Sequence, residues 1–164
     1  YTGLATDTGF FHFISQDAAA EVFTRAASFT EAGVDPYFMY DKLTDGKKLT
    51  EILSTARILE NTKQFFDGRL LIAEQPKDIE DSRLSDDIYG QLLKVQDVRA
   101  VVLLKEKEDR VEIGFRAKRD SGIDVGELAQ SIGGGGHRLA AGASSDLSLN
   151  ESEKKVIELF SSVI

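Results

Sequence analysis

Four consecutive glycines, Gly133 to Gly136, run directly into His137 and Arg138. Glycine costs about 0.5–1 kcal/mol relative to alanine inside a regular element, so the run indicates a backbone task that side chains would obstruct. Without Cβ atoms, successive amides can turn toward one point and let an anion lie against the main chain. Histidine can donate or accept near neutral pH, and the arginine fork fits phosphate oxygens. These residue types together predict an anion-binding loop.

Two well-known phosphate-binding loops do not fit this run. No Lys-Ser or Lys-Thr follows it, so the P-loop spacing is absent. A dinucleotide fingerprint requires a preceding strand, whereas the residues before the glycines have the pattern of a helix. The alternative is a plain loop in which Gly133 ends that helix and the other glycines fill space. The glycine run alone leaves both interpretations open.

A locally basic segment precedes the glycines. Arg116, Lys118 and Arg119 cluster in "GFRAKR", and residues 116–138 carry four basic and three acidic side chains in a chain of net charge −8. A solvated strand end would explain the cluster equally simply. Beside the glycines and the histidine, however, arginines suited to phosphate favour anion binding.

Composition restricts the possible classes of protein. The chain has 164 residues, of which 41% are hydrophobic and 29% charged, as in a soluble globular protein. No apolar run approaches the roughly 18 residues of a membrane span. The absence of cysteine excludes disulfides and thiolate metal sites and fits a cytoplasmic protein. The negative net charge argues against a protein that coats nucleic acid by bulk attraction. The opening "YTGLATDTGFF", without an initiating Met, suggests a piece of a longer polypeptide.

The first third of the chain has helical patterns. Apolar spacing predicts a helix over 17–32, with Asp17 as its N-cap and Gly33 as its stop. Asp35-Pro36 predicts the start of a short helix, because proline suits the first helical position. Leu49, Ile52, Leu53, Ala56 and Leu59 would share one face of a helix over about 47–60.

The remainder alternates strands with helices. Asp67-Gly68 between two short apolar runs predicts a hairpin with a primed turn. A helix over about 85–95, a strand over 98–104 buried on both faces, and an alternating strand over 111–117 follow. Asp124, with Glu127 three residues on, predicts a capping box for a short helix, and Asn150 is expected to cap the last one. The fold class is therefore α+β, with a mixed sheet flanked by helices.

Two segments resemble a known family. "GIDVGELAQSIGGGGHRLAAGA", preceded by "IGFRAK", is similar to the C-terminal DHH-associated domain of the DHH phosphoesterases, in the branch that degrades very short RNAs and often acts on 3′-phosphoadenosine 5′-phosphate (pAp). The opening resembles the last metal-binding motif of their N-terminal DHH domain. The resemblance implies that residues 1–45 end a DHH catalytic domain, that 46–61 form a linker helix, and that 62–164 form the substrate-binding domain.

The resemblance also implies roles for single residues. Asp7 would be a manganese ligand, and Arg116 would bind the substrate backbone. Ala117 replaces the family's usual serine, which removes a hydroxyl contact. No residue of this chain is assigned a catalytic role. The remaining substrate-binding residues would be Gly134, Gly135, Gly136, His137 and, in a less constant part of the motif, Arg138.

The departures from the family are equally informative. Its reaction uses two metal ions, and manganese at such a site needs several oxygen and imidazole ligands. The chain lacks an Asp-His-His motif and an earlier D-x-D pair, and its only histidines are His12 and His137. We therefore expect a hydrolase whose N-terminal DHH domain is missing here, and a fragment without activity of its own.

Three functions remain open from the sequence. The first is the substrate-binding part of a manganese-dependent phosphodiesterase or phosphatase acting on oligoribonucleotides and pAp. The second is a relative that cleaves cyclic dinucleotides or single-stranded DNA. The third is a non-catalytic nucleic-acid-binding module, like the related domain of alanyl-tRNA synthetases. The "DTG" motif favours an enzyme, and the acidic charge disfavours a large tRNA footprint.

Overall fold

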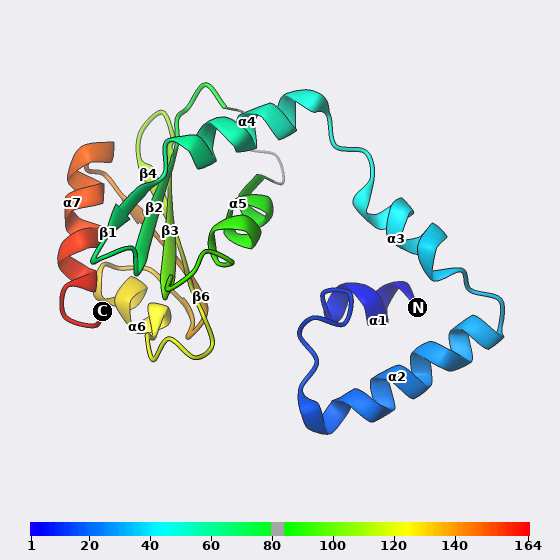
Figure 1. Cartoon of the computed structure of the whole chain (residues 1–164). Helices are drawn as coiled ribbons and strands as arrows, with labels where there is room; N and C mark the ends of the chain where they lie inside the picture. The colour runs from blue at the N-terminus through cyan, green and yellow to red at the C-terminus, as the bar shows by residue number, and fades with distance from the viewer. Residues whose placement is uncertain (80–83) are drawn as a thin grey trace. The chain divides into compact units, whose positions relative to one another are not determined.

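The computed structural model describes residues 1–79 and 84–164 (Figure 1). Its contacts divide the chain into two compact units, Tyr1–Lys47 and Lys48–Ile164. The segment 46–61, expected as a linker, therefore lies almost wholly within the second unit. The three-part domain division itself stays a prediction. None of the helices in the described ranges is long and apolar enough to cross a membrane.

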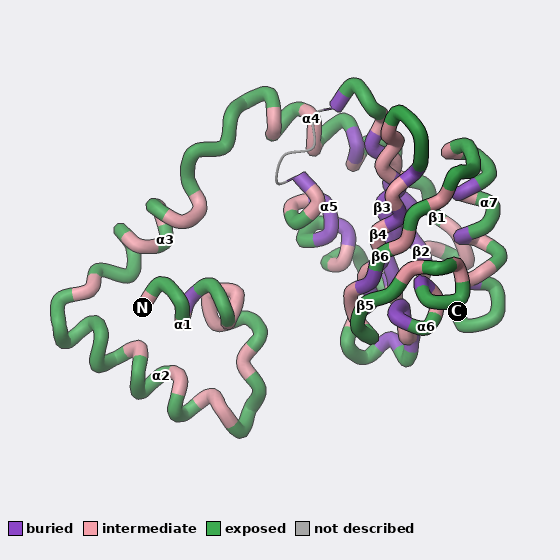
Figure 2. Tube along the Cα trace, turned by 180° about the vertical axis from the view of Figure 1, so that it is seen from behind, coloured by how far each residue is buried: buried purple, intermediate pink, exposed green. Residues whose placement is uncertain are grey.

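The first unit is helical and has almost no core. It contains α1 (Thr2–Asp7), α2 (Gln16–Glu31) and α3 (Pro36–Thr44). Ala5 is its only buried residue, and Figure 2 shows the unit as exposed or intermediate nearly throughout. Six aromatic side chains of this unit are between 37% and 74% exposed: Phe13, Phe23, Phe29, Tyr37, Phe38 and Tyr40.

Local signals set the helix ends of this unit. The Asp35 carboxylate accepts from the backbone amides of Tyr37 and Phe38, which confirms the predicted start of α3. Gly33 has φ +94° and ends α2 as predicted. The prediction for the start of α2 was wrong, because Ser15 occupies the N-cap position and Asp17 lies in the first turn.

In the described part of the second unit, six strands form one mixed sheet in the order β1-β2-β3-β4-β6-β5. Only β2 and β3 pair in parallel. The expected α+β class is confirmed. The strands are β1 (Lys63–Phe65), β2 (Leu70–Gln75), β3 (Ala100–Glu106), β4 (Val111–Ala117), β5 (Gly135–His137) and β6 (Ala140–Ser145), and the helices are α4 (Leu49–Glu60), α5 (Leu84–Leu92), α6 (Val125–Ser131) and α7 (Leu149–Phe160).

The hairpin of β1 and β2 forms where the sequence predicts it. Phe66, Asp67 and Gly68 have φ +53°, +56° and +82°, and the Arg69 amide donates to the Phe66 carbonyl across the turn. Positive φ at both Asp67 and Gly68 is the feature of a primed turn, and Phe66 extends the left-handed segment by one residue.

Both faces of the sheet are covered, so the unit has two hydrophobic clusters (Figure 1). Val111, Ile113 and Phe115 of β4 pack with α6 and α7 on one face. Val101 and Leu103 of β3 pack with α4 and α5 on the other. Residues Ala100–Leu104 are fully buried, which confirms a strand covered on both sides. Each large side chain buried in this way contributes about 1.5–3 kcal/mol.

The N-terminal caps of two helices in the second unit, α6 and α7, differ from the prediction. Ser148, and not Asn150, caps α7 through a reciprocal bond with Glu151. Asp124 caps α6 as expected, but its bonds come from the Gly126 and Glu127 amides, without a return bond from the Glu127 side chain.

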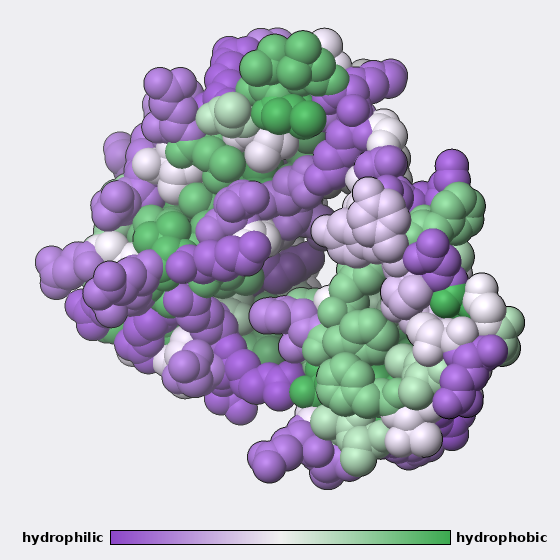
Figure 3. Space-filling model, turned by 45° about the vertical axis from the view of Figure 1, so that its right-hand side comes forward, coloured by the Kyte–Doolittle hydropathy of each residue, from purple (hydrophilic) through white to green (hydrophobic). Residues whose placement is uncertain are grey.

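The apolar periodicity of α4 predicts its helix correctly but not which face is buried. Leu49, Ile52 and Leu53 are 52–69% exposed, whereas Ile58 is 1% exposed and packs on the sheet. Apolar patches of this kind appear on the molecular surface in Figure 3. Spacing alone identifies a face but not the element that covers it.

Candidate functional site

The predicted substrate-binding residues lie in two neighbouring clefts. One, which we call the sheet-face cleft, has a volume of about 540 Å³ and contains Arg116. The other, the edge groove, has a volume of about 450 Å³ and contains His137 and Arg138. Gly134 lines both. The structure therefore divides the predicted substrate-binding residues between two clefts.

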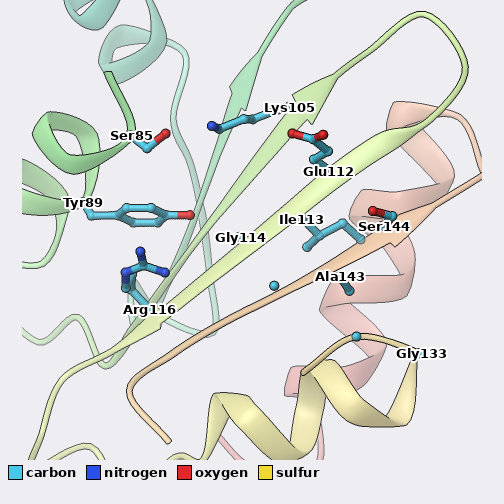
Figure 4. A pocket seen from close by; sticks show the side chains of 12 residues that line it. Ser85, Tyr89, Lys105, Glu112, Ile113, Gly114, Arg116, Gly133, Ala143 and Ser144 are labelled. Atoms are coloured by element: carbon cyan, nitrogen blue, oxygen red, sulfur yellow. The ribbon is translucent and has the colours of Figure 1, made fainter. Parts of the chain in front are cut away.

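Strand alternation and one helix build the sheet-face cleft. Glu112, Gly114 and Arg116 lie on the same side of β4, as the sequence predicts, because successive side chains of a strand point to opposite faces. The first turns of α5 contribute two hydroxyl-bearing side chains (Figure 4). The polar side chains lining the cleft are Ser85, Tyr89, Lys105, Glu112, Arg116 and Ser144.

Arg116 places a positive charge in this cleft. Its guanidinium carbon lies 4.5 Å from the centroid of the Tyr89 ring, and its Nη1 donates to the Phe115 carbonyl at 3.0 Å. Within residues 1–79 and 84–164, Arg116 forms no ion pair with a carboxylate. A half-buried cation that is held in place without an acidic partner is suited to an anionic ligand.

Tyr89 is the most buried polar side chain at the cleft. It is 6% exposed, and burial raises the pKa of its phenol to about 12, although the Arg116 charge offsets part of this rise. Its hydroxyl lies against the backbone of Gly114, where any Cβ would overlap the oxygen. A side chain at position 114 would therefore displace the Tyr89 hydroxyl from its place in the cleft.

The floor of the cleft lacks side chains at its centre. Gly114 of β4 and Gly142 of β6 are direct partners across the two strands. A Cβ on Gly142 would meet only the Ile113 carbonyl oxygen, at 3.6 Å. A ligand can therefore approach the backbone closely at Gly142, beside the Tyr89 hydroxyl.

The second half of the glycine run, Gly135 and Gly136, lies in the edge strand β5 and not in the predicted loop. Gly133 has φ +82° and ends α6, as the alternative interpretation expects. Gly135 to His137 then pair with β6. Added Cβ atoms would overlap the Gly142 carbonyl oxygen at Gly134 and would lie 2.5 Å from the Ala141 Cα at Gly136. These two glycines permit close strand packing, which is a structural task.

His137 and Arg138 are exposed at the edge groove. That groove also contains Asp124 and Glu127, so acidic groups accompany the basic ones. The Arg138 carbonyl accepts from the Val125 amide and ties this segment to α6. Neither side chain lines the sheet-face cleft, and their roles in binding stay predictions.

The comparisons with known proteins agree with the motifs. Residues 67–164 match the DHHA1 domain. The chain belongs to the DHHA1 domain family. The predicted relationship to the DHH-associated domain is therefore confirmed.

Relatives of this DHHA1 chain are about twice its length. It is 30% identical over 158 residues to the bifunctional oligoribonuclease and PAP phosphatase NrnA of Thermus thermophilus, covering 96% of this chain and 47% of that protein. The protein of the same name from Bacillus subtilis is 24% identical over 148 residues, covering 88% and 45%. The chain thus spans about half the length of these curated relatives.

Two solved structures share the fold. An exopolyphosphatase-related protein from Bacteroides fragilis has a TM-score of 0.85 at 19% identity, covering 97% of this chain and 47% of its own. The pGpG-specific phosphodiesterase PggH from Vibrio cholerae has a TM-score of 0.55 at 18% identity, covering 70% and 40%. At these identities the likeness supports the architecture of the DHHA1 domain.

Asp7 does not form a metal site with its surroundings. It is the exposed last residue of α1, and no group of three or more His, Cys, Asp or Glu in the described ranges could hold an ion. Manganese prefers several oxygen and imidazole ligands, which one carboxylate does not supply. The described residues therefore do not fit a manganese centre, and the role of Asp7 stays a prediction.

Three residues of the sheet-face cleft were not identified from the sequence, namely Tyr89, Ser85 and Ser144. The sequence did hold a signal for a close contact, because a glycine such as Gly114 inside a regular strand often marks the close approach of another group. The group that approaches is Tyr89, which lies 25 residues before Gly114 in the chain. Only the tertiary fold brings the two together.

Proposed function

We propose that this DHHA1 domain is the substrate-binding part of a phosphoesterase that hydrolyses very short oligoribonucleotides and pAp. The names of the curated relatives support this reaction class. The observation that carries the proposal is the Arg116 guanidinium, which is held in the sheet-face cleft by Tyr89 without an acidic partner in the described residues. Arginine binds phosphate oxygens through its planar fork of donors.

The size and lining of the cleft suit a nucleotide. A volume of about 540 Å³ lies within the range of roughly 300–1,000 Å³ that small-molecule sites occupy. Ser85 and Ser144 add hydroxyls that can donate or accept. We propose that Arg116 binds a phosphate of the substrate and that these hydroxyls contact its sugar or base.

We further propose that residues 1–45 are the end of a DHH catalytic domain. A unit with one buried residue and six exposed aromatic side chains does not bury enough apolar surface to offset the entropy of ordering its chain. Its aromatic side chains are suited to packing against further protein. Asp7 would then contribute one manganese ligand among others supplied by that domain.

The first test concerns hydrolysis by the chain alone. The 164-residue protein, incubated with a ribodinucleotide and manganese(II), should release no mononucleotide above the rate of the metal alone, because the described residues lack a metal centre. The full-length Thermus thermophilus relative serves as the positive control. Turnover by this chain would contradict the proposal that it is inactive by itself.

The ligand class is tested by competition in the same preparation. We expect a ribodinucleotide to displace a fluorescent ribodinucleotide more effectively than a deoxyribodinucleotide or a cyclic dinucleotide does. If the deoxyribodinucleotide or the cyclic dinucleotide displaces the probe more effectively, a phosphodiesterase acting on single-stranded DNA or on cyclic dinucleotides is favoured instead. Tight binding only to long RNA would favour a non-catalytic module.

A further inference from the structure

The Tyr89 side chain is buried, and its hydroxyl has no hydrogen-bond partner among the described residues. Tyr89 is 6% exposed, and among the described residues its oxygen makes no hydrogen bond. The oxygen is not sealed from the cleft, because Tyr89 lines the cleft and its hydroxyl is directed toward Gly114 (Figure 4). Buried polar groups in folded proteins are normally hydrogen-bonded. An unpaired hydroxyl that lines a cleft therefore points to a ligand.

We propose that the Tyr89 hydroxyl and the Arg116 guanidinium bind the same phosphate group of the ligand. This inference rests on the proposed function, because it assumes that a nucleotide enters the sheet-face cleft. It assigns two tasks to one side chain. The ring of Tyr89 holds the guanidinium, and its hydroxyl donates to the ligand.

The arrangement of the two side chains fits a shared phosphate. Figure 4 shows the ring of Tyr89 directly beside Arg116, with the phenolic oxygen directed toward Gly114 and the cleft. The guanidinium carbon is 4.5 Å from the ring centroid, within the range of a cation–π contact. Beside the hydroxyl lies Gly142, whose bare backbone leaves room for a phosphate. A guanidinium that is already held loses less freedom when it binds.

The charges around the cleft also favour this end for the phosphate. Glu112 is four residues from Arg116 along β4, which corresponds to about 13 Å of strand. It pairs in register with Lys105 of β3. Glu112, the acidic side chain that lines the cleft, therefore lies away from Arg116 and beside a lysine. Asp86 of α5 does not line the cleft, although its charge acts on Tyr89. The phosphate would lie between Arg116 and Tyr89.

A phosphate is a better partner for this hydroxyl than a sugar. Burial raises the pKa of the Tyr89 phenol to about 12, so the group remains a hydrogen-bond donor throughout the neutral range. The neighbouring guanidinium is a donor only, whereas the phenol can donate and accept. A phosphate oxygen accepts from both groups at once, and its negative charge is attracted by the guanidinium.

The test compares Tyr89→Phe with the wild-type chain, using adenosine 5′-monophosphate and adenosine as probes. Removing the hydroxyl should weaken binding of the monophosphate about tenfold, because a hydrogen bond to a charged group is lost. Adenosine should bind both proteins equally. Tyr37→Phe, at a tyrosine that is 74% exposed in the first unit, is the matched control. Equal loss for both probes would mean a sugar contact and would overturn the inference.

A second variant separates the ring from the hydroxyl. Tyr89→Leu should weaken monophosphate binding more than Tyr89→Phe does, because Arg116 is no longer held. That extra loss should disappear in an Arg116→Ala background, where the ring has no guanidinium to hold. Thermal unfolding establishes that each variant is folded, and any loss of affinity is measured in the folded fraction.

The outcomes distinguish the inference from the proposed function. If Arg116→Ala weakens monophosphate binding but Tyr89→Phe does not, the shared phosphate is wrong and the proposed cleft stands. If neither variant changes the affinity, the cleft itself is not the binding site. The inference requires loss in both variants, with adenosine binding unaffected by Tyr89→Phe.

Discussion

Gly134→Ala and Gly136→Ala should each lower the free energy of unfolding of the second unit by about 2–4 kcal/mol, whereas Gly135→Ala should change it by less than about 1 kcal/mol. A Cβ at Gly134 would overlap the carbonyl oxygen of Gly142, and one at Gly136 would lie 2.6 Å from the Ala140 carbonyl oxygen. Gly136 also has φ +146°, which side chains rarely adopt. A Cβ at Gly135 would meet nothing within 4 Å.

Urea unfolding of the three variants measures these changes. Because all three are Gly→Ala changes within three consecutive residues, differences in glycine entropy in the unfolded chain cancel between them. A large destabilisation by Gly135→Ala, equal to that of Gly136→Ala, would contradict the strand geometry. It would indicate a task for all the glycines that the pairing with β6 does not explain.

The second large effect is expected at Arg116. Arg116→Ala should weaken binding of a ribodinucleotide by about 1.5–3 kcal/mol, because a charged partner of the phosphate is removed. Arg116→Lys should recover only part of the affinity, since an ammonium keeps the charge but loses the planar fork and its stacking on Tyr89. Isothermal titration calorimetry of the folded variants provides the measurement.

A matched control excludes a general effect of charge. Arg25→Ala removes an exposed arginine that is paired with Glu21 in the first unit, and it should leave the affinity unchanged. A general effect of net charge would weaken binding similarly in both variants, because each loses one positive charge. An unchanged affinity in Arg116→Ala would contradict the proposed function.

Local patterns predicted the elements that depend on local chemistry. The turn at Asp67-Gly68, the Asp35 cap and the Gly33 stop all follow from conformations that a few neighbouring residues determine. The alternation of β4 likewise follows from a period of two along one strand. For this reason the side of the sheet that carries Arg116 could be expected from the sequence.

Long-range packing explains what the sequence left undetermined. Glycine has low strand propensity, so the pairing of Gly135 with Gly142 could not be recognised from the glycine run. The exposed face of α4 and the position of Tyr89 beside Arg116 depend in the same way on segments far apart in the chain. The sequence therefore did not show that the predicted substrate-binding residues line two separate clefts.

The most direct test of the central claim is to map a bound ribodinucleotide on the isotope-labelled chain by its amide NMR signals. If the sheet-face cleft is the binding site, the signals of Gly114, Arg116 and Gly142 should shift in proportion to occupancy, and those of the first unit should not. Shifts confined to residues 135–138 of the edge groove, or the absence of shifts at a saturating concentration, would contradict the account.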